Sequence, residues 1–137
     1  MKILGIDYGT ARIGLAVSDP DERIASPLTV IKNENAMAKI MKIAEETGAG
    51  KIVVGIPSDS MGRDTKQSVR IREFARVLEE KTGIETVLFD ENYSTRDAYD
   101  ALKQMGYSMK KSKGKVDKIA ASLFLTEYLE WKRNLNS

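Results

Sequence analysis

Three strand-length apolar runs open this chain before any helical pattern occurs, and helices and strands alternate after them. The three runs cover residues 2–8, 12–18 and 24–31, and each is separated from the next by a short turn. Caps, glycines and the spacing of apolar residues then predict, in order, a helix ending near 47, a strand over 51–56, a helix over 64–82, a strand over 86–89, and helices over 94–105 and 116–133.

This order restricts the fold to a small set. Residues 51–56 form a continuous apolar run that ends at Pro57, which is typical of a strand buried on both faces. Two hairpins followed by helical crossovers predict an α/β fold with a mixed five-stranded sheet and helices on both faces. The first strand would lie centrally, with the fourth and fifth strands parallel to it. We expect residues 1–137 to form a single domain.

The absence of two residue types narrows the possible chemistry. The chain has no Cys and no His, which excludes disulfides, thiolate and imidazole metal ligands, and every His-based catalytic triad. The net charge of +2 is too small to indicate nucleic-acid binding, so any such interface must rest on local patches. No apolar stretch is long enough to span a membrane and the start does not resemble a signal peptide, so we expect a cytoplasmic protein.

Carboxylates stand at three places where an apolar element begins or ends. Asp7 ends the first strand, Asp90 and Glu91 end the fifth, and Asp117 opens the last helix. The carboxyl ends of parallel strands meet at one edge of a sheet, so Asp7 and the pair 90–91 should converge there. Clustered carboxylates repel one another unless a cation lies between them, and hard oxygen ligands suit Mg²⁺ or Mn²⁺. This pattern indicates a metal-dependent, phosphodiester-cutting enzyme.

The position of Asp117 on its helix supports this interpretation. Counting in helical steps places it at the head of the stripe that should face the sheet. The members of that stripe are Asp117, Ala120, Ala121, Phe124, Tyr128 and Trp131. A structural role at the helix N-terminus would explain the first-turn position of an Asp but not its inward face.

The sequence also allows other roles for several of these polar residues. Asp7 could serve only as a turn-forming residue that bonds to local backbone. Asp90 and Glu91 alternate across their strand, so only one can join the site, and periodicity does not choose between them. Ser94 and Thr95 lack a His to activate them and are better explained by helix capping.

A basic stretch precedes Asp117 and could hold the phosphates that carboxylates repel. We expect an irregular loop over 107–115, with four lysines and no acidic partner. The candidate nucleic-acid contacts are Lys110, Lys111, Lys113, Lys115, Arg12 and Arg63.

Four motifs in order resemble the YqgF (RuvX) family of the RNase H-like nuclease superfamily, over nearly the whole chain. They begin with the stretch 5–14, Gly-Ile-Asp-Tyr-Gly-Thr-Ala-Arg-Ile-Gly, and the stretch 54–57, Val-Gly-Ile-Pro, with Gly62 and Phe74-Ala75 after it. The other two are the stretch 90–95, Asp-Glu-Asn-Tyr-Ser-Thr, and the group Lys113, Lys115, Asp117, Ala120 and Ala121.

The resemblance implies an RNase H-like fold and a nuclease that uses two Mg²⁺ or Mn²⁺ ions and matures the 5′ end of precursor 16S rRNA. Its acidic trio would be Asp7, Glu91 and Asp117, so the choice of Glu91 over Asp90 comes from the resemblance. The family usually has Arg after the Asp-Glu pair, where this chain has Asn92. The expected partners are structured RNA, precursor rRNA or branched DNA, and ribosomal particles.

Three rival functions are compatible with parts of the sequence. An older assignment within the family is Holliday-junction resolution, on four-way DNA. The stretch 5–10 also resembles the phosphate loop of actin-like ATPases, but those need two domains and 137 residues supply one. The third is a non-catalytic RNA- or ribosome-binding module, which would gain nothing from carboxylates concentrated beside RNA.

Overall fold

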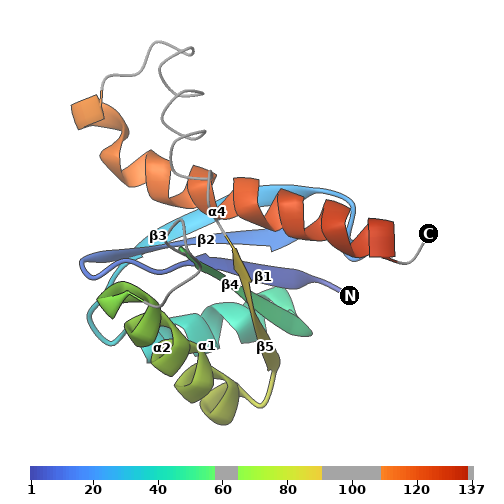
Figure 1. Cartoon of the computed structure of the whole chain (residues 1–137), viewed down its shortest axis with the longest axis horizontal. Coiled ribbons are helices and arrows are strands. Elements are labelled where there is room, and N and C mark those ends of the chain that lie inside the picture. The colour runs from blue at the N-terminus through green and yellow to red at the C-terminus, as the bar shows by residue number, and fades with distance from the viewer. Residues whose placement is uncertain (58–64, 91–108, 136–137) are drawn as a thin grey trace.

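The computed structural model describes residues 1–57, 65–90 and 109–135, the last segment with its side chains from Lys118 onwards. It contains five strands and three helices in these ranges (Figure 1). In chain order they are β1 (Ile3–Asp7), β2 (Arg12–Ser18), β3 (Ala25–Lys32), α1 (Ala36–Thr47), β4 (Lys51–Ile56), α2 (Lys66–Thr82), β5 (Glu85–Asp90) and α4 (Met109–Leu135). The helix predicted over 94–105 lies outside the described residues.

The strands form one mixed sheet in the order β3-β2-β1-β4-β5. The first three are antiparallel neighbours, whereas β4 runs parallel to β1 and β5 runs parallel to β4. This confirms the predicted five-stranded sheet, with β1 at its centre and the fourth and fifth strands parallel to it. Within the described residues, no helix is long and apolar enough to cross a membrane.

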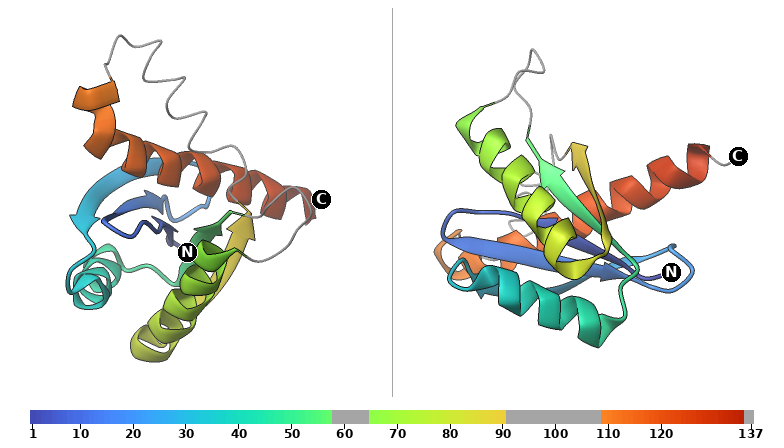
Figure 2. Two further views of the ribbon diagram at one scale, coloured as in Figure 1. Left: turned by 60° about the vertical axis from the view of Figure 1, so that its left-hand side comes forward. Right: turned by 90° about the horizontal axis from the view of Figure 1, so that it is seen from below.

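Helices cover both faces of the sheet, as Figure 2 shows. Helices α1 and α2 lie on one face, where Leu4 and Ile6 of β1 join the larger apolar core. Helix α4 crosses the other face, where Ile3 belongs to a second core with Phe124 and Leu125. Successive residues of β1 therefore alternate between the two faces, as side chains on any strand do. We call these the α1/α2 face and the α4 face.

Small residues allow α4 to lie close to the centre of the sheet. Ala120 and Ala121 of α4 are completely buried. A β-carbon built on Gly5 would lie only 3.1 Å from the Cβ atom of Leu125, tighter than ordinary van der Waals contact. The predicted inward face of this helix is confirmed from Ala120 to Tyr128, and Gly5 allows its close approach from the sheet side.

Helix α4 is longer at its start than the sequence pattern predicts. It begins at Met109 instead of 116, so the stretch expected to be an irregular basic loop is helical. Lysine and methionine are good helix formers, and a single glycine such as Gly114 costs about 1 kcal/mol. A long helix anchored by a buried C-terminal half can tolerate that cost.

The turn between β1 and β2 is tied to the far end of β3. Asn33 donates a side-chain hydrogen bond of 2.9 Å to the carbonyl oxygen of Gly9, and its backbone N–H donates to the carbonyl of Ala11. Asn33 and Asn35 both precede α1, and asparagine is a favoured N-cap residue. Asn35 occupies the N-cap position, in a left-handed conformation, without a side-chain cap bond. Asn33 thus stabilises the turn that follows Asp7.

Gly9 is the residue of this turn that tolerates a side chain least. A β-carbon there would lie 2.4 Å from the carbonyl oxygen of Arg12, so the backbone would have to shift. We predict that Gly9→Ala lowers the free energy of unfolding by about 1–3 kcal/mol, the usual cost of an overpacked site. Urea denaturation would measure the change. The neighbouring exposed residue provides the control, since Thr10→Ala should stay within about 0.5 kcal/mol of wild type. Equal midpoints for the two variants would contradict this account of the turn.

Candidate active site

The candidate site is built around one row of residues that crosses four strands. Strand pairing sets Asp7 opposite Gly14 on β2 and beside Gly55 on β4, and Gly55 lies in turn beside Phe89 on β5. Residues paired in this way present their side chains to the same face of a sheet. Asp7, which is partly exposed, therefore has a glycine on each side, and neither glycine contributes a side chain to the space around its carboxylate.

The row faces α4. The adjacent row, one residue back along each parallel strand, consists of Ile6, Val54 and Leu88, which pack on the α1/α2 face. Asp7 and Phe89 alternate with these residues, and Phe89 contacts Tyr128 of α4. The Asp7 carboxylate therefore lies on the face that α4 covers, which is the helix that carries Asp117.

The same alternation places Asp90 on the opposite face. It pairs with Ile56 and follows Phe89, so it lies on the α1/α2 side with Leu88. Its side chain is exposed. Sequence reasoning stated that only one of Asp90 and Glu91 could join the site, and within β5 Asp90 is on the wrong face to join Asp7.

The remaining members of the predicted site are described only in part. Asp117 lies within α4, one turn before the buried pair Ala120 and Ala121, but in a stretch whose side chains are not described. The four lysines belong to the same helix, within that same stretch. Glu91 and Arg63 lie outside the described residues. No group of three acidic side chains close enough to hold a metal occurs among the residues that are described.

Arg12 begins β2 two residues before Gly14, the cross-strand partner of Asp7. Residues two apart on a strand share a face, so Arg12 is on the α4 face with Asp7. It is partly exposed. A guanidinium at this position would suit an anion bound near the carboxylate.

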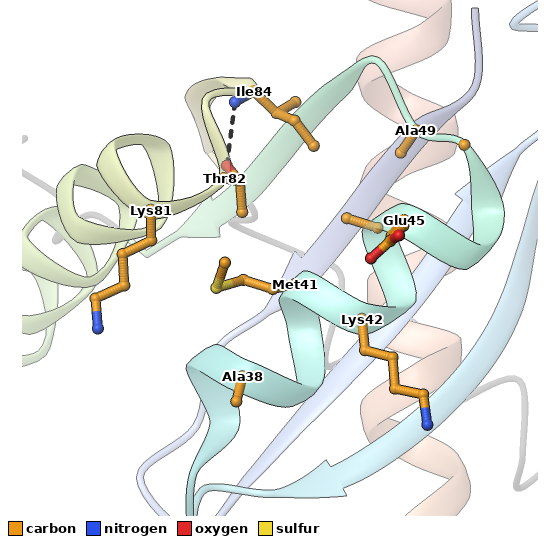
Figure 3. A pocket seen from close by; sticks show the side chains of 10 residues that line it. Ala38, Met41, Lys42, Glu45, Ala49, Lys81, Thr82 and Ile84 are labelled. Carbon is orange, nitrogen blue, oxygen red and sulfur yellow. Dashed lines mark hydrogen bonds between the residues drawn. The ribbon is translucent and has the colours of Figure 1, made fainter.

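A groove elsewhere on the molecule has a different character. It measures about 660 Å³ and lies between α1 and α2 on the other face, where Met41, Thr82 and Ile84 contribute to its lining (Figure 3). Its lining comes from α1 and from the C-terminal end of α2, and Asp7 is at the opposite end of the parallel strands. Glu45 is its one acidic lining residue, so it does not offer a carboxylate cluster.

Sequence reasoning missed an aromatic cluster at the end of the Asp7 row. Phe89 contacts both Tyr128 and Trp131, with ring centroids 5.4 and 5.8 Å apart. Tyr128 and Trp131 also contact each other, at 5.8 Å. Helical spacing placed Tyr128 and Trp131 on one stripe, but it could not show that Phe89 of β5 joins them.

Comparison with known proteins gives the family. The RuvX family, described as Holliday junction resolvase, matches residues 1–131. The chain is 36% identical over 135 residues to a Chloroflexus aurantiacus protein named "Putative pre-16S rRNA nuclease", covering 96% of this chain and 88% of that protein. A Maridesulfovibrio salexigens protein of the same name is 39% identical over 132 residues, covering 94% and 98%.

The fold also has solved relatives. Thermus thermophilus RuvC in complex with a Holliday junction substrate superposes with a TM-score of 0.62 at 15% identity, covering 98% of this chain and 96% of that one. This likeness confirms the predicted RNase H-like fold. The match over residues 1–131 and the relatives above 30% identity show that the chain belongs to the RuvX family of nucleases.

Proposed function

We propose that this nuclease is a metal-dependent endonuclease that hydrolyses phosphodiester bonds, using Asp7, Glu91 and Asp117 to hold two Mg²⁺ or Mn²⁺ ions. The single observation that carries the proposal is the position of Asp7. It is an acidic residue at the carboxyl end of the central strand, with a glycine on each side and α4 over its face. Few structural roles require a carboxylate on this face between two glycines.

The described part of the site fits a hard divalent cation. Carboxylate oxygens are the ligands that such cations prefer, and the two flanking glycines leave room beside Asp7 for an ion and a phosphate. When bound, the ions would supply an activated water and stabilise the leaving oxygen, so the protein needs no histidine as a general base. The task of the chain is then to hold the carboxylates in place and to orient the backbone of the substrate.

Basic residues would perform the second task. Arg12 shares the α4 face with Asp7, and the lysines at 110, 111, 113 and 115 precede Asp117 on the same helix. We propose that these side chains and Arg63 bind phosphates on either side of the bond that is cut. Because the lysines are on a helix instead of a loop, their backbone positions are set by α4.

The proposed substrate is the 5′ end of precursor 16S rRNA. The names of the two relatives support this choice, and so does their close match in length to this chain. The family description favours a second candidate, a four-way DNA junction. Ribosomal particles that carry the immature rRNA would be the natural partners of the first activity, and branched DNA would be the substrate of the second.

We predict that Asp7→Asn reduces metal-dependent cleavage by more than about 100-fold. Even residues that only support metal ligands are commonly worth 10–100-fold, and this change removes a proposed ligand. The measurement is the initial rate with Mn²⁺ on precursor 16S leader RNA and on a four-way DNA junction, with EDTA as the blank. The thermal midpoint should not fall, since removing a charge relieves repulsion at the site. Wild-type rates across a Mn²⁺ titration would contradict the proposal, and the preferred substrate decides between the two candidates.

A second prediction compares two adjacent acidic residues. Asp90→Asn should retain cleavage within about threefold of wild type, because Asp90 is exposed on the α1/α2 side and changes at such positions rarely perturb a remote site. Glu91→Gln should lose both cleavage and Mn²⁺ affinity, which titration calorimetry would measure. An inactive Asp90→Asn variant together with an active Glu91→Gln variant would overturn the proposed trio while leaving the fold intact.

A further inference from the structure

Trp131 is a half-exposed aromatic side chain held by two others. It lies against Phe89 and Tyr128 at centroid distances of 5.8 Å each, yet 48% of its surface remains exposed. Tyr128 is almost completely buried, at 3% exposure. Among the described residues, Trp131 is the one aromatic side chain in the group of large exposed hydrophobic residues, and the others in that group are aliphatic or Met. The cluster therefore presents one indole to the outside on a buried aromatic base.

The exposure of Trp131 departs from the sequence pattern. Helical spacing assigned it to the stripe facing the sheet, and the earlier members of that stripe from Ala120 to Tyr128 are indeed buried. The indole lies against Phe89 of β5, an edge strand, and the sheet has no strand beyond β5 to cover it. Positions where a structure departs from its sequence pattern are concentrated at functional sites, because residues there are selected for binding or catalysis as well as for packing.

The indole is fixed in place by the contacts of the neighbouring residues. Lys132 donates a 2.6 Å hydrogen bond to Glu22, and this contact lowers the pKa of the Glu22 carboxyl, so the ion pair persists at neutral pH. Arg133 donates to the carbonyl oxygen of Arg23. These bonds fasten the end of α4 to the β2–β3 turn and limit the freedom of the helix segment that carries Trp131.

Phe89 connects the cluster to the row that carries Asp7, whereas Trp131 lies towards the amino end of β1, where the next residue of α4 bonds to the β2–β3 turn. Asp7, Gly55 and Phe89 occupy one row on the α4 face, and two strand spacings place the Cα atom of Phe89 about 10 Å from that of Asp7. Because Gly55 contributes no side chain, Phe89 is the next side chain along the row from the carboxylate. Lys51 lies with its amine 5.5 Å from the centre of the Tyr128 ring, and Tyr128 and then Glu85 raise its pKa, which keeps a positive charge beside the cluster.

We propose that Trp131 stacks on an unpaired base of the nucleic-acid strand whose backbone lies at Asp7. This inference rests on the proposed nuclease function and specifies its substrate as a strand with at least one unpaired nucleotide a few nucleotides from the cut. An exposed, immobilised indole suits the face of a base, and such stacking tolerates any base identity. A base inside a duplex is already stacked on both faces and is not available to this platform.

The single tryptophan of the chain makes the contact directly observable. Tryptophan fluorescence is titrated with a single-stranded oligonucleotide in EDTA, so that no cleavage occurs, and then with the same strand made abasic and with a fully paired duplex. Binding is followed in parallel by anisotropy of a label on the nucleic acid. The proposal expects strong quenching by the first strand and little quenching by the other two at equal saturation. Equal quenching by the abasic strand, or binding without quenching, would overturn it.

Variants test the same contact through affinity. Trp131→Ala should weaken binding of the single strand by about 5- to 100-fold and leave duplex binding unchanged, whereas Trp131→Phe should recover most of the loss. Leu135→Ala is the matched control, because Leu135 is 64% exposed on the same helix. Equal affinities for Trp131→Ala and wild type would overturn the proposal. If the wild-type protein sediments as a dimer and Trp131→Ala as a monomer with unchanged binding, the indole serves contact between two copies of the chain and the proposal is likewise overturned. Quenching that persists in a protein without cleavage activity would retain the platform and reject the nuclease, so the two failures are distinct.

Discussion

The close packing of α4 on β1 is the constraint on which the rest of this structure depends. Leu125 lies directly against Gly5, and the completely buried Ala120 and Ala121 precede it on the helix. A helix packed this closely at the centre of the sheet must carry its first half past the carboxyl end of β1, where Asp7 lies. The same contact directs its second half towards the amino end of β1, where Lys132 bonds to Glu22 of the β2–β3 turn. Larger residues at these positions would separate the helix from the edge that carries the candidate site.

The two faces of the sheet differ in composition. The α1/α2 face carries the larger apolar core, with Ile40, Ile71 and Leu78 completely buried, and burying such side chains contributes roughly 1.5–3 kcal/mol each. The α4 face has glycines beside its carboxylate and an aromatic cluster at its margin. A protein can hold acidic residues and an exposed indole on one face when the other face supplies much of the burial. The groove between α1 and α2 belongs to the stabilising face.

The order and direction of the strands could be predicted from the sequence, because they follow from local patterns and topological rules. The buried run at 51–56 and the strand ending at Asp7 determined which strands are parallel and where a site could form. Other features depend on contacts distant in sequence. The pattern could not show that Asn33 bonds to Gly9, that α4 continues back to Met109, or that Trp131 lies half-exposed against the edge strand β5. The face of Asp90 likewise required the register of β5 against β4.

The central claim is that the α4 side of Asp7 binds divalent cations. The most direct measurement is anomalous diffraction from crystals of the protein soaked in Mn²⁺, compared with crystals of Asp7→Asn treated in the same way. The account predicts Mn²⁺ peaks within coordination distance of the Asp7 carboxylate, on the face covered by α4, and their loss in the variant. Mn²⁺ bound beside Asp90 on the other face, or no Mn²⁺ near Asp7, would contradict it.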